Sequence, residues 1–311
     1  MKKVRKVVFP AAGFGTRFLP ATKVIPKEML AVVDKPIIQY GVEEALAAGC
    51  DQIIIITAHG KSAIEDHFDI SHELETALEK RGKTELLELS RSISNMVQIS
   101  YVRQKEAMGL GHAVLMAKDL VDDEPFAVML PDDVIDAPVP CMKQMIDVFE
   151  RVQSTILATQ VVEGPAISSY GVLDGTPLKE NPRIIEARGM VEKPRAEDAP
   201  SKNAIIGRYI LTPAIFDLLE RITPGAGGEL QLTDAIKGLL RTEKVYGYNF
   251  EGVRYDAGDK LGMLKATVDF ALKRRDLGPA FREYLKSLDL GDSSSNERRM
   301  TQNDKVFAKA V

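Results

Sequence analysis

The sequence predicts a layered α/β fold, and three stretches in its first half carry that prediction. An apolar run at 7–9 ends in a loop of small residues, and the apolar residues of 36–48 then recur at helical spacing. Residues 53–57 follow as a run of β-branched residues bounded by polar ones, which is typical of a strand buried on both faces. A strand, a helix and a strand in this order indicate a right-handed parallel unit. We therefore expect the N-terminal half to be a sheet covered by helices.

Composition excludes several classes of protein. The chain has 311 residues, enough to bury a full core, and its net charge of -4 gives no electrostatic reason to expect nucleic acid or an anionic membrane as a partner. Cys50 and Cys141 are too few for a disulfide framework. The start is basic, but the apolar run after it stops at Pro10, which is too short for a signal peptide. We expect a cytoplasmic protein in a reducing compartment.

The stretch GFGTRFLPATKVIPKEML and the residues just before it contain the strongest chemical signal. Small residues, which leave room for backbone N–H groups to approach an anion, stand at Ala11, Ala12, Gly13 and Gly15. Three cations follow on a segment interrupted by two prolines, at Arg17, Lys23 and Lys27. Because proline fixes φ, we expect a stiff, extended connection that presents these cations together. This combination predicts a polyphosphate site.

Two familiar nucleotide-binding motifs fit the stretch poorly. A dinucleotide fingerprint needs a third glycine and a helix that opens on the loop, with an acidic residue about 20 positions on. Asp34 falls near the acidic position, but Phe18 stands where the third glycine is expected, and Pro20 and Pro26 interrupt the helix. A P-loop fails as well, because no Gly-Lys-Ser/Thr follows the glycines. An ordinary glycine turn is the remaining alternative, and the cations argue against it.

A pair of carboxylates follows the strand expected at 126–130. Asp132 and Asp133 come after Pro131, and two adjacent carboxylates are costly unless a cation lies beside them. Because successive strand residues point to opposite faces, only one of the two can face bound phosphates as a Mg²⁺ ligand. A simple turn is the alternative interpretation of the pair.

Two further stretches are candidates for binding a small molecule. Gln104 and the glycine turn at 109–111 stand where a strand ends and a helix begins, the place where open α/β sheets bind ligands. An amide and a backbone N–H could read the edge of a base there, although a plain helix start is the alternative. Glu192 and Lys193 pair an acceptor suited to sugar hydroxyls with a cation suited to a phosphate. Without context the same pair would be a charged turn.

Taken in order, these motifs resemble the sugar-1-phosphate nucleotidylyltransferases from residue 5 to about residue 272. The amino-acid sequence GFGTRFLPATKVIPKEML most resembles that of the bacterial members that use UTP and glucose 1-phosphate. The resemblance implies a three-layer, Rossmann-like mixed sheet with a strand-rich sugar-binding part and C-terminal helices. It implies a single domain over 1–288, with a nucleotide-binding part, a sugar-binding part and C-terminal helices at about 1–160, 161–262 and 263–288. Residues 289–311 are polar and without period, so we expect a disordered tail.

The resemblance also implies a role for each candidate residue. The catalytic cations are Arg17, Lys27 and Lys193. The Mg²⁺ ligands are Asp132 and Asp256, with Asp259 as the alternative to the second. The nucleotide contacts are Ala11, Ala12, Gly13, Gly15, Gln104, Gly109 and Asp133, where the last would bond the ribose or brace its loop. The sugar-phosphate contacts are Gly171, Glu192, Lys193 and Gly207.

The reaction implied is in-line attack of glucose 1-phosphate on the α-phosphorus of UTP, with Mg²⁺ as cofactor and pyrophosphate as the leaving group. The attacking phosphate is already ionised, so no general base is needed. A thymidylyltransferase is the closest alternative, and a non-catalytic nucleotide-sensing subunit of the same fold is a more distant one. We expect a homo-oligomer, a dimer or a tetramer, whose interface apolar C-terminal helices could supply.

Three smaller expectations concern residues outside these motifs. His59, His67 and His72 have no carboxylate partner at metal-binding spacing, so we assign them to the surface. His112 is expected to pack on its helix. The charged stretch from Glu73 to Leu89 is expected to form one long helix.

Overall fold

The computed structural model describes residues 2–225 and 228–289. The chain divides into two compact units, which comprise residues 1–266 and 267–311. Of the tail expected at 289–311, all but the first residue lies outside the described residues.

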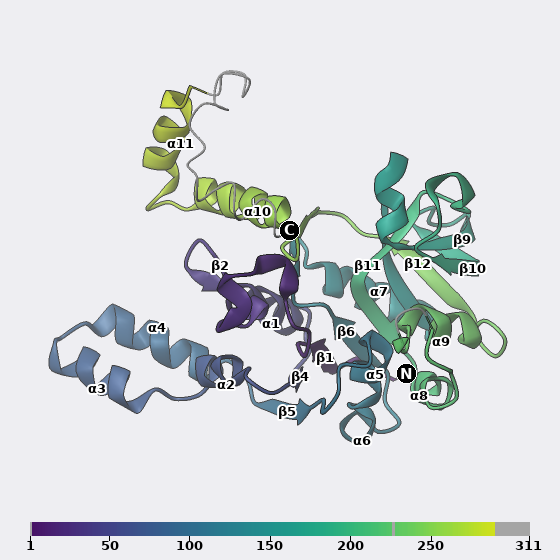
Figure 1. The fold of residues 1–311 in the computed structure, drawn as a ribbon, viewed down its shortest axis with the longest axis horizontal. Helices are drawn as coiled ribbons and strands as arrows, with labels where there is room; N and C mark the ends of the chain where they lie inside the picture. The colour runs from purple at the N-terminus through teal and green to yellow at the C-terminus, as the bar shows by residue number, and fades with distance from the viewer. Residues whose placement is uncertain (1, 226–227, 290–311) are drawn as a thin grey trace. The chain divides into compact units, whose positions relative to one another are not determined.

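The first unit is built on one large mixed sheet (Figure 1). Its nine strands in the described residues are, in spatial order, β5 (Ile99–Arg103), β4 (Gln52–Thr57), β1 (Lys6–Pro10), β6 (Phe126–Met129), β11 (Asn203–Leu211), β8 (Thr155–Val161), β12 (Val245–Asn249), β10 (Ile184–Glu192) and β9 (Gly171–Pro177). Strands β5, β4, β1 and β6 are parallel, as the first half of the sequence predicts. Strand β11 runs antiparallel to β6 and β8 and also pairs with β9, so the strand-rich half curls back on itself.

Helices cover both faces of the sheet, because its central strands are apolar on both sides. In β1, Val7 and Phe9 join one buried cluster, while Val8 joins the other. Helices on the first face are α1 (Ile37–Ala47), α2 (Ser62–Phe68) and α7 (Cys141–Val152). Helices on the second face are α5 (Leu110–Leu115), α6 (Lys118–Val121), α8 (Ala214–Leu219) and α9 (Leu232–Leu239). The predicted three-layer mixed α/β fold is confirmed.

The single helix expected at 73–89 is wrong. The structure forms two helices, α3 (His72–Lys80) and α4 (Thr84–Ser94), which pack side by side. Gly82 lies between them with φ +63°, a left-handed conformation that ends a helix and that glycine adopts without strain. The helical spacing of apolar residues continued past this glycine, so periodicity alone did not reveal the break.

Several short elements complete the chain. The hairpin β2 (Ala31–Val32) and β3 (Lys35–Pro36) precedes α1, and β7 (Asp133–Asp136) forms a two-stranded ribbon with β13 (Val253–Asp256). The 3-10 turns are η1 (Thr16–Phe18), η2 (Ala21–Lys23), η3 (Lys27–Met29), η4 (Gly164–Ser169) and η5 (Ala196–Asp198). The last helices are α10 (Lys260–Lys273) and α11 (Gly278–Ser287). Within the described ranges, every helix is too short or too polar to cross a membrane.

Candidate active site

The loop after β1 folds more tightly than the sequence predicts. The Ala11 N–H donates to the Ile56 carbonyl at 2.8 Å, so the loop starts at the edge of the sheet. Gly15 has φ +66°, and a Cβ on it would lie 2.9 Å from the Lys27 Cβ, so only glycine fits there. The stiff, extended connection expected for the cations is wrong: three short 3-10 turns carry them instead. The proline φ angle suits such turns as well as an extended chain, and the pattern could not separate the two.

Of the three predicted cations, one lines a large cavity and a second pairs with a carboxylate that lines it. Arg17 lines the cavity, and its Nη1 donates to the Gly258 carbonyl at 3.5 Å. Lys27 Nζ pairs with Asp132 Oδ2 at 2.5 Å. Burial alone would raise the pKa of Asp132, but the charge and hydrogen bond of Lys27 outweigh burial and hold this pKa below its ordinary value. Lys23 is exposed.

The two carboxylates predicted to bind metal face the same point. The ribbon of β7 and β13 sets Asp133 opposite Asp256, and the Ala257 N–H donates to the Asp132 carbonyl at 2.8 Å. A Cβ on Gly258 would lie 2.7 Å from Asp132 Oδ2 and 3.0 Å from Asp256 Oδ1. The glycine therefore keeps open the space between two anionic oxygens that come from distant parts of the chain.

Asp259, the alternative to Asp256, has a different partner. Its Oδ2 accepts hydrogen bonds from the N–H groups of Leu261 at 3.0 Å and Gly262 at 3.1 Å. These contacts cap the first turn of α10, a role for which aspartate is well suited. Asp256 Oδ1 also accepts a hydrogen bond, from the Gly258 N–H at 3.0 Å, but it lies beside the same point as Asp132 Oδ2, which favours Asp256 over Asp259 as the partner of Asp132.

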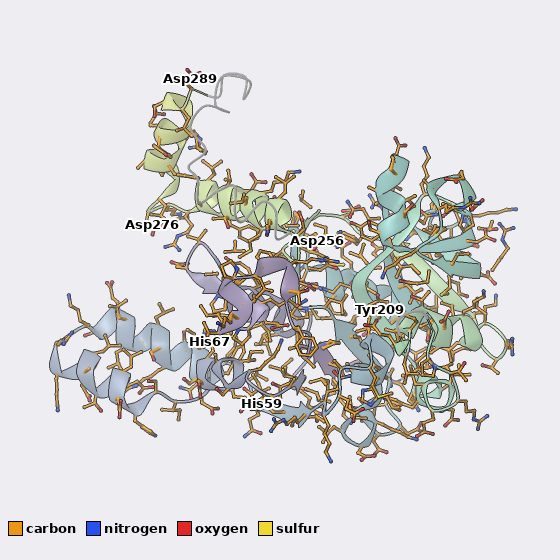
Figure 2. All side chains as sticks on the ribbon, viewed as in Figure 1. His59, His67, Tyr209, Asp256, Asp276 and Asp289 are labelled. Atoms are coloured by element: carbon orange, nitrogen blue, oxygen red, sulfur yellow. The ribbon has the colours of Figure 1, made fainter. Side chains whose placement is uncertain are left out.

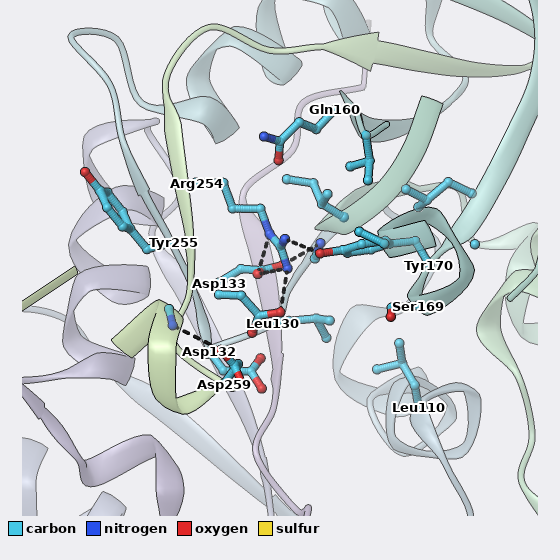
Figure 3. Close-up of a pocket in the computed structure, with 18 of the residues that line it drawn as sticks. Leu110, Leu130, Asp132, Asp133, Gln160, Ser169, Tyr170, Arg254, Tyr255 and Asp259 are labelled. Carbon is cyan, nitrogen blue, oxygen red and sulfur yellow. Dashed lines mark hydrogen bonds and ion pairs between the residues drawn. The ribbon is translucent and has the colours of Figure 1, made fainter. Parts of the chain in front are cut away.

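Asp133 braces its loop. Its Oδ2 accepts from the Gly207 N–H at 2.8 Å, and its Oδ1 accepts from Arg254 Nε at 2.6 Å. Burial raises the pKa of Asp133, although Arg254 opposes that effect. Figure 3 shows the Arg254 guanidinium between Asp133 and the Tyr170 hydroxyl, to which it donates at 3.1 Å. Of the two roles expected for Asp133, the contacts support bracing over ribose binding.

Sequence reasoning missed two arginines that organise this region. Arg254 lies in a stretch where the motifs indicate Asp256 and its alternative Asp259 but not the arginine. Arg208, 1 % exposed, binds Glu44 at 2.7 Å and donates to the backbone carbonyls of Leu130, Gly207 and Asp133. A charged residue inside the apolar strand NAIIGRYIL was the available signal, because a buried arginine requires partners.

The candidate sugar residues gather on β9, β10 and β11. Gly171 lies opposite Glu192 in the β9–β10 pairing, and a Cβ on Gly171 would lie 3.0 Å from Glu192 Oε2. Thr233 Oγ1 donates to the same Glu192 oxygen at 2.7 Å. Lys193 has φ +45°, and its side chain is 62 % exposed, with Nζ 3.7 Å from Glu192 Oε1. Thr233, in the first turn of α9, thus contacts the candidate sugar site through Glu192.

The candidate base residues lie at the end of β5. The Gln104 N–H donates to the Thr57 carbonyl at 2.8 Å, and its side-chain Nε2 lies 2.7 Å from His112 Nδ1. His112 was expected only to pack on its helix, so this contact is a correction. Gly109 has φ +92°, and a Cβ on it would lie 2.7 Å from the Glu229 Cβ. The segment before α9 thus packs tightly on the predicted glycine turn.

One cavity of about 830 Å³ brings about half of these groups together. Its lining includes eight predicted or alternative site residues, which are Arg17, Asp132, Asp133, Gly171, Glu192, Gly207, Asp256 and Asp259. Lys27 reaches the cavity through its ion pair with Asp132. The remaining predicted residues lie outside its lining, and these are Ala11, Ala12, Gly13, Gly15, Gln104, Gly109 and Lys193.

Of the three histidines assigned to the surface, two are exposed and the third is partly buried, which corrects the assignment for His67. His59 and His72 are exposed, while His67 is partly buried, and its Nε2 lies 2.9 Å from Gln39 Oε1 (Figure 2 labels His59 and His67). In the described part of the chain, no group of three or more His, Cys, Asp or Glu side chains is placed to hold a metal. A metal at Asp132 and Asp256 would need ligands from outside the protein.

Fold and site together define a nucleotidyl transferase. A model of the nucleotidyl transferase family matches residues 6–273, and the chain belongs to this family. The resemblance that the motifs carry is therefore confirmed.

Individual relatives agree on a narrower class. The UTP–glucose-1-phosphate uridylyltransferase of Bacillus subtilis is 51 % identical over 288 residues, covering 93 % of this chain and 98 % of the relative. A protein of the same name from Staphylococcus epidermidis is 50 % identical over 290 residues, covering 93 % of this chain and all of the relative. The UTP-bound UGPase from Acinetobacter baumannii is 41 % identical with a TM-score of 0.86, over 92 % of this chain and all of that one. A UDP-glucose pyrophosphorylase complexed with UDP-glucose is 45 % identical with a TM-score of 0.80, over 87 % of this chain and all of that one.

Proposed function

We propose that this chain transfers the uridylyl group of UTP to glucose 1-phosphate, forming UDP-glucose and pyrophosphate. The observation that carries the proposal is that Asp132 and Asp256 face one point beside a cavity of about 830 Å³ that Arg17 also lines. Relatives with about half of their residues identical carry the name of this activity. Two similar solved structures hold UTP or UDP-glucose.

The reaction is an exchange of one phosphorus–oxygen bond for another. An ionised oxygen of glucose 1-phosphate forms a bond to the α-phosphorus of UTP, while the bond from that phosphorus to the bridging oxygen of the β-phosphate breaks. The electron pair leaves with pyrophosphate, and no proton has to move before the attack. Such a reaction requires position and charge compensation from the protein.

The carboxylate pair fits Mg²⁺. This ion uses oxygen ligands in octahedral geometry and is commonly held by one or two carboxylates, with waters and substrate phosphates filling the other positions. Asp132 and Asp256 supply two such oxygens, and Gly258 leaves the space between them open. Bound there, Mg²⁺ would neutralise charge on the α-phosphate.

Two of the predicted cations are assigned to the leaving pyrophosphate, and the third is assigned to the attacking phosphate. Lys27 compensates the charge of Asp132, and a bound triphosphate would offer Lys27 a second anionic partner. Arg17 stands with Lys27 on the pyrophosphate side. Lys193, exposed and next to Glu192, is free to reach the phosphate of the incoming sugar. Removing one charged contact of this kind costs about 1.5 to 3 kcal/mol.

The remaining predicted residues bind by shape and hydrogen bonding. Backbone N–H groups of the loop at 11–15 cradle the phosphates, while Gln104 and Gly109 read the base. Gly171, Glu192 and Gly207 bind the sugar, where the absence of a side chain on the two glycines lets the hexose approach.

The test is pyrophosphate release in Mg²⁺ from a grid of substrates. UTP, dTTP, ATP, CTP and GTP are each paired with the 1-phosphates of glucose, galactose, mannose and N-acetylglucosamine, and Asp132→Asn is the control variant. We expect release confined to UTP with glucose 1-phosphate and lost in the control. A preference for dTTP would identify a thymidylyltransferase with the same mechanism, and no release from folded protein would favour a nucleotide-sensing subunit.

The proposal also covers the oligomeric state and the cellular location of the enzyme. We infer a homo-oligomer, because the last helices expose apolar side chains such as Leu264 and Tyr284, which are 63 % and 57 % exposed. Light scattering on a sizing column measures this, and a monomer at micromolar concentration would contradict it. A cytoplasmic location follows from the substrates, both of which are cytoplasmic metabolites, and fractionation of cells tests it.

A further inference from the structure

The contact between Gln104 and His112 is the feature that the proposed function leaves unused. Gln104 is 5 % exposed, and its Nε2 lies 2.7 Å from His112 Nδ1. With the amide in this orientation, Nε2 donates and the unprotonated Nδ1 accepts. The amide oxygen then points away from His112, and it has no hydrogen-bond partner among the described residues.

Backbone hydrogen bonds hold the segments that carry Gln104 and His112 in place. The Gln104 N–H extends the ladder between β5 and β4 through its bond to Thr57. On the other side, the Gly111 N–H donates to the Leu230 carbonyl at 2.8 Å, and a Cβ on Gly111 would lie 2.6 Å from that oxygen. Helix α5, which carries His112, therefore cannot shift toward or away from Gln104 without breaking this packing.

An amide side chain has two orientations of nearly equal shape. A half-turn exchanges its oxygen and nitrogen, which exchanges an acceptor for a donor at the same place. A neutral hydrogen bond worth about 0.5 to 1.5 kcal/mol biases such an equilibrium by roughly 2- to 12-fold. His112 Nδ1, as an acceptor, stabilises the orientation in which the Gln104 oxygen is the free acceptor.

Uracil and cytosine differ in the pattern that such an amide would read. Uracil presents an N3–H donor next to the O4 acceptor, whereas cytosine presents the N3 acceptor next to an N4 amino donor. The Gln104 amide oxygen can accept from the uracil N3–H, and the amide N–H that His112 does not use can donate to the uracil O4. The flipped amide matches cytosine instead, so the orientation of Gln104 would decide between the two bases.

We propose that His112 is the positioning residue that sets the base specificity of this site, by holding the Gln104 amide in the orientation that accepts uracil and rejects cytosine. The inference rests on the proposed function, because it assumes that Gln104 faces the base of the nucleotide.

The test measures equilibrium binding of UTP and of CTP by titration calorimetry, without glucose 1-phosphate so that turnover cannot interfere. His112→Leu removes the acceptor and keeps an apolar side chain on the helix, whereas His112→Gln retains an acceptor. Gln104→Leu removes the amide itself. Thermal melting of each variant verifies that it is folded.

We expect His112→Leu to reduce the ratio of UTP to CTP affinity by about 2- to 12-fold, and His112→Gln to restore most of it. If His112→Leu weakens the binding of UTP and of CTP equally, His112 only packs. If neither affinity changes, another group orients Gln104. Either result leaves the ratio unchanged and overturns the inference. An unchanged ratio in Gln104→Leu would instead show that the base lies elsewhere, which refutes the proposed base site itself.

Discussion

The buried ion pair between Lys61 and Glu28 gives the sharpest stability prediction. Lys61 Nζ lies 2.8 Å from Glu28 Oε2, and the two side chains are 8 % and 0 % exposed. The second oxygen of Glu28 is buried without a hydrogen-bond partner in the described residues. Glu28 belongs to η3 next to Lys27, so this pair fixes the turn from which Lys27 reaches Asp132.

Lys61→Met removes the cation and leaves the carboxylate buried. Burial already raises the pKa of Glu28, and Lys61 opposes that rise, so removing Lys61 should raise this pKa further and favour the protonated carboxyl in the folded state. Protonating a glutamate with an unfolded pKa of about 4.3 costs about 3.7 kcal/mol at pH 7. This agrees with the range of about 3 to 5 kcal/mol for breaking a buried pair.

The penalty has a definite dependence on pH. A glutamate with a raised folded pKa contributes stability below its unfolded pKa and loses that contribution as pH rises through the folded value. The variant should therefore approach the stability of the parent near pH 4.5 and fall about 3 to 4 kcal/mol below it at pH 7. Urea unfolding followed by circular dichroism at the two pH values measures this.

Two matched variants sharpen the result. Adding Glu28→Gln to Lys61→Met removes the buried charge and should recover most of the stability at pH 7. Lys202→Met breaks the exposed pair with Glu163 and should leave stability unchanged, because exposed pairs contribute little. A Lys61→Met penalty that is the same at both pH values would refute the reasoning, since it would then reflect packing and not charge.

Further predictions concern the site and the protein's acid stability. Gly258→Ala places a Cβ 2.7 Å from Asp132 Oδ2 and 3.0 Å from Asp256 Oδ1, so Mg²⁺-dependent turnover should fall by about 10- to 150-fold, the cost of one lost charged contact. Gly189→Ala, where nothing lies within 4 Å of the new Cβ, should be active. Lys193→Ala should lower kcat/KM for glucose 1-phosphate by about 10- to 150-fold with little change in KM for UTP. Asp132→Asn should lose turnover even at saturating levels of both substrates. Equal effects of Lys193→Ala on both substrates would count against the role of Lys193. Burial lowers the pKa of His67, so the contribution of the neutral imidazole to stability is present above pH 6.5 and is lost as pH falls through the folded pKa. The melting temperature of His67→Leu should therefore decrease less between pH 6.5 and 5 than that of the parent protein. An equal decrease in both proteins would contradict this prediction.

The local features of this protein follow from neighbouring residues, and the sequence was sufficient for them. The β-branched run at 53–57 forms β4, and the small residues before Arg17 form the loop at the end of β1. Each depends on the spacing of a few adjacent side chains, which is what periodicity and turn chemistry report. Gly82 shows the limit even here, because a glycine inside a helical pattern can be tolerated or can end the helix.

Tertiary structure decided which charges meet. Lys27 pairs with Asp132 and Arg254 with Asp133, over separations of 105 and 121 residues, and no local pattern marks these partners. Asp256 faces Asp132 only because β13 pairs with β7 in one particular register. The sequence states which ionisable groups exist and on which element each lies. Their partners, and therefore their pKa values and roles, depend on how distant elements pack, since a charge is stabilised by what surrounds it in space and not by its neighbours along the chain.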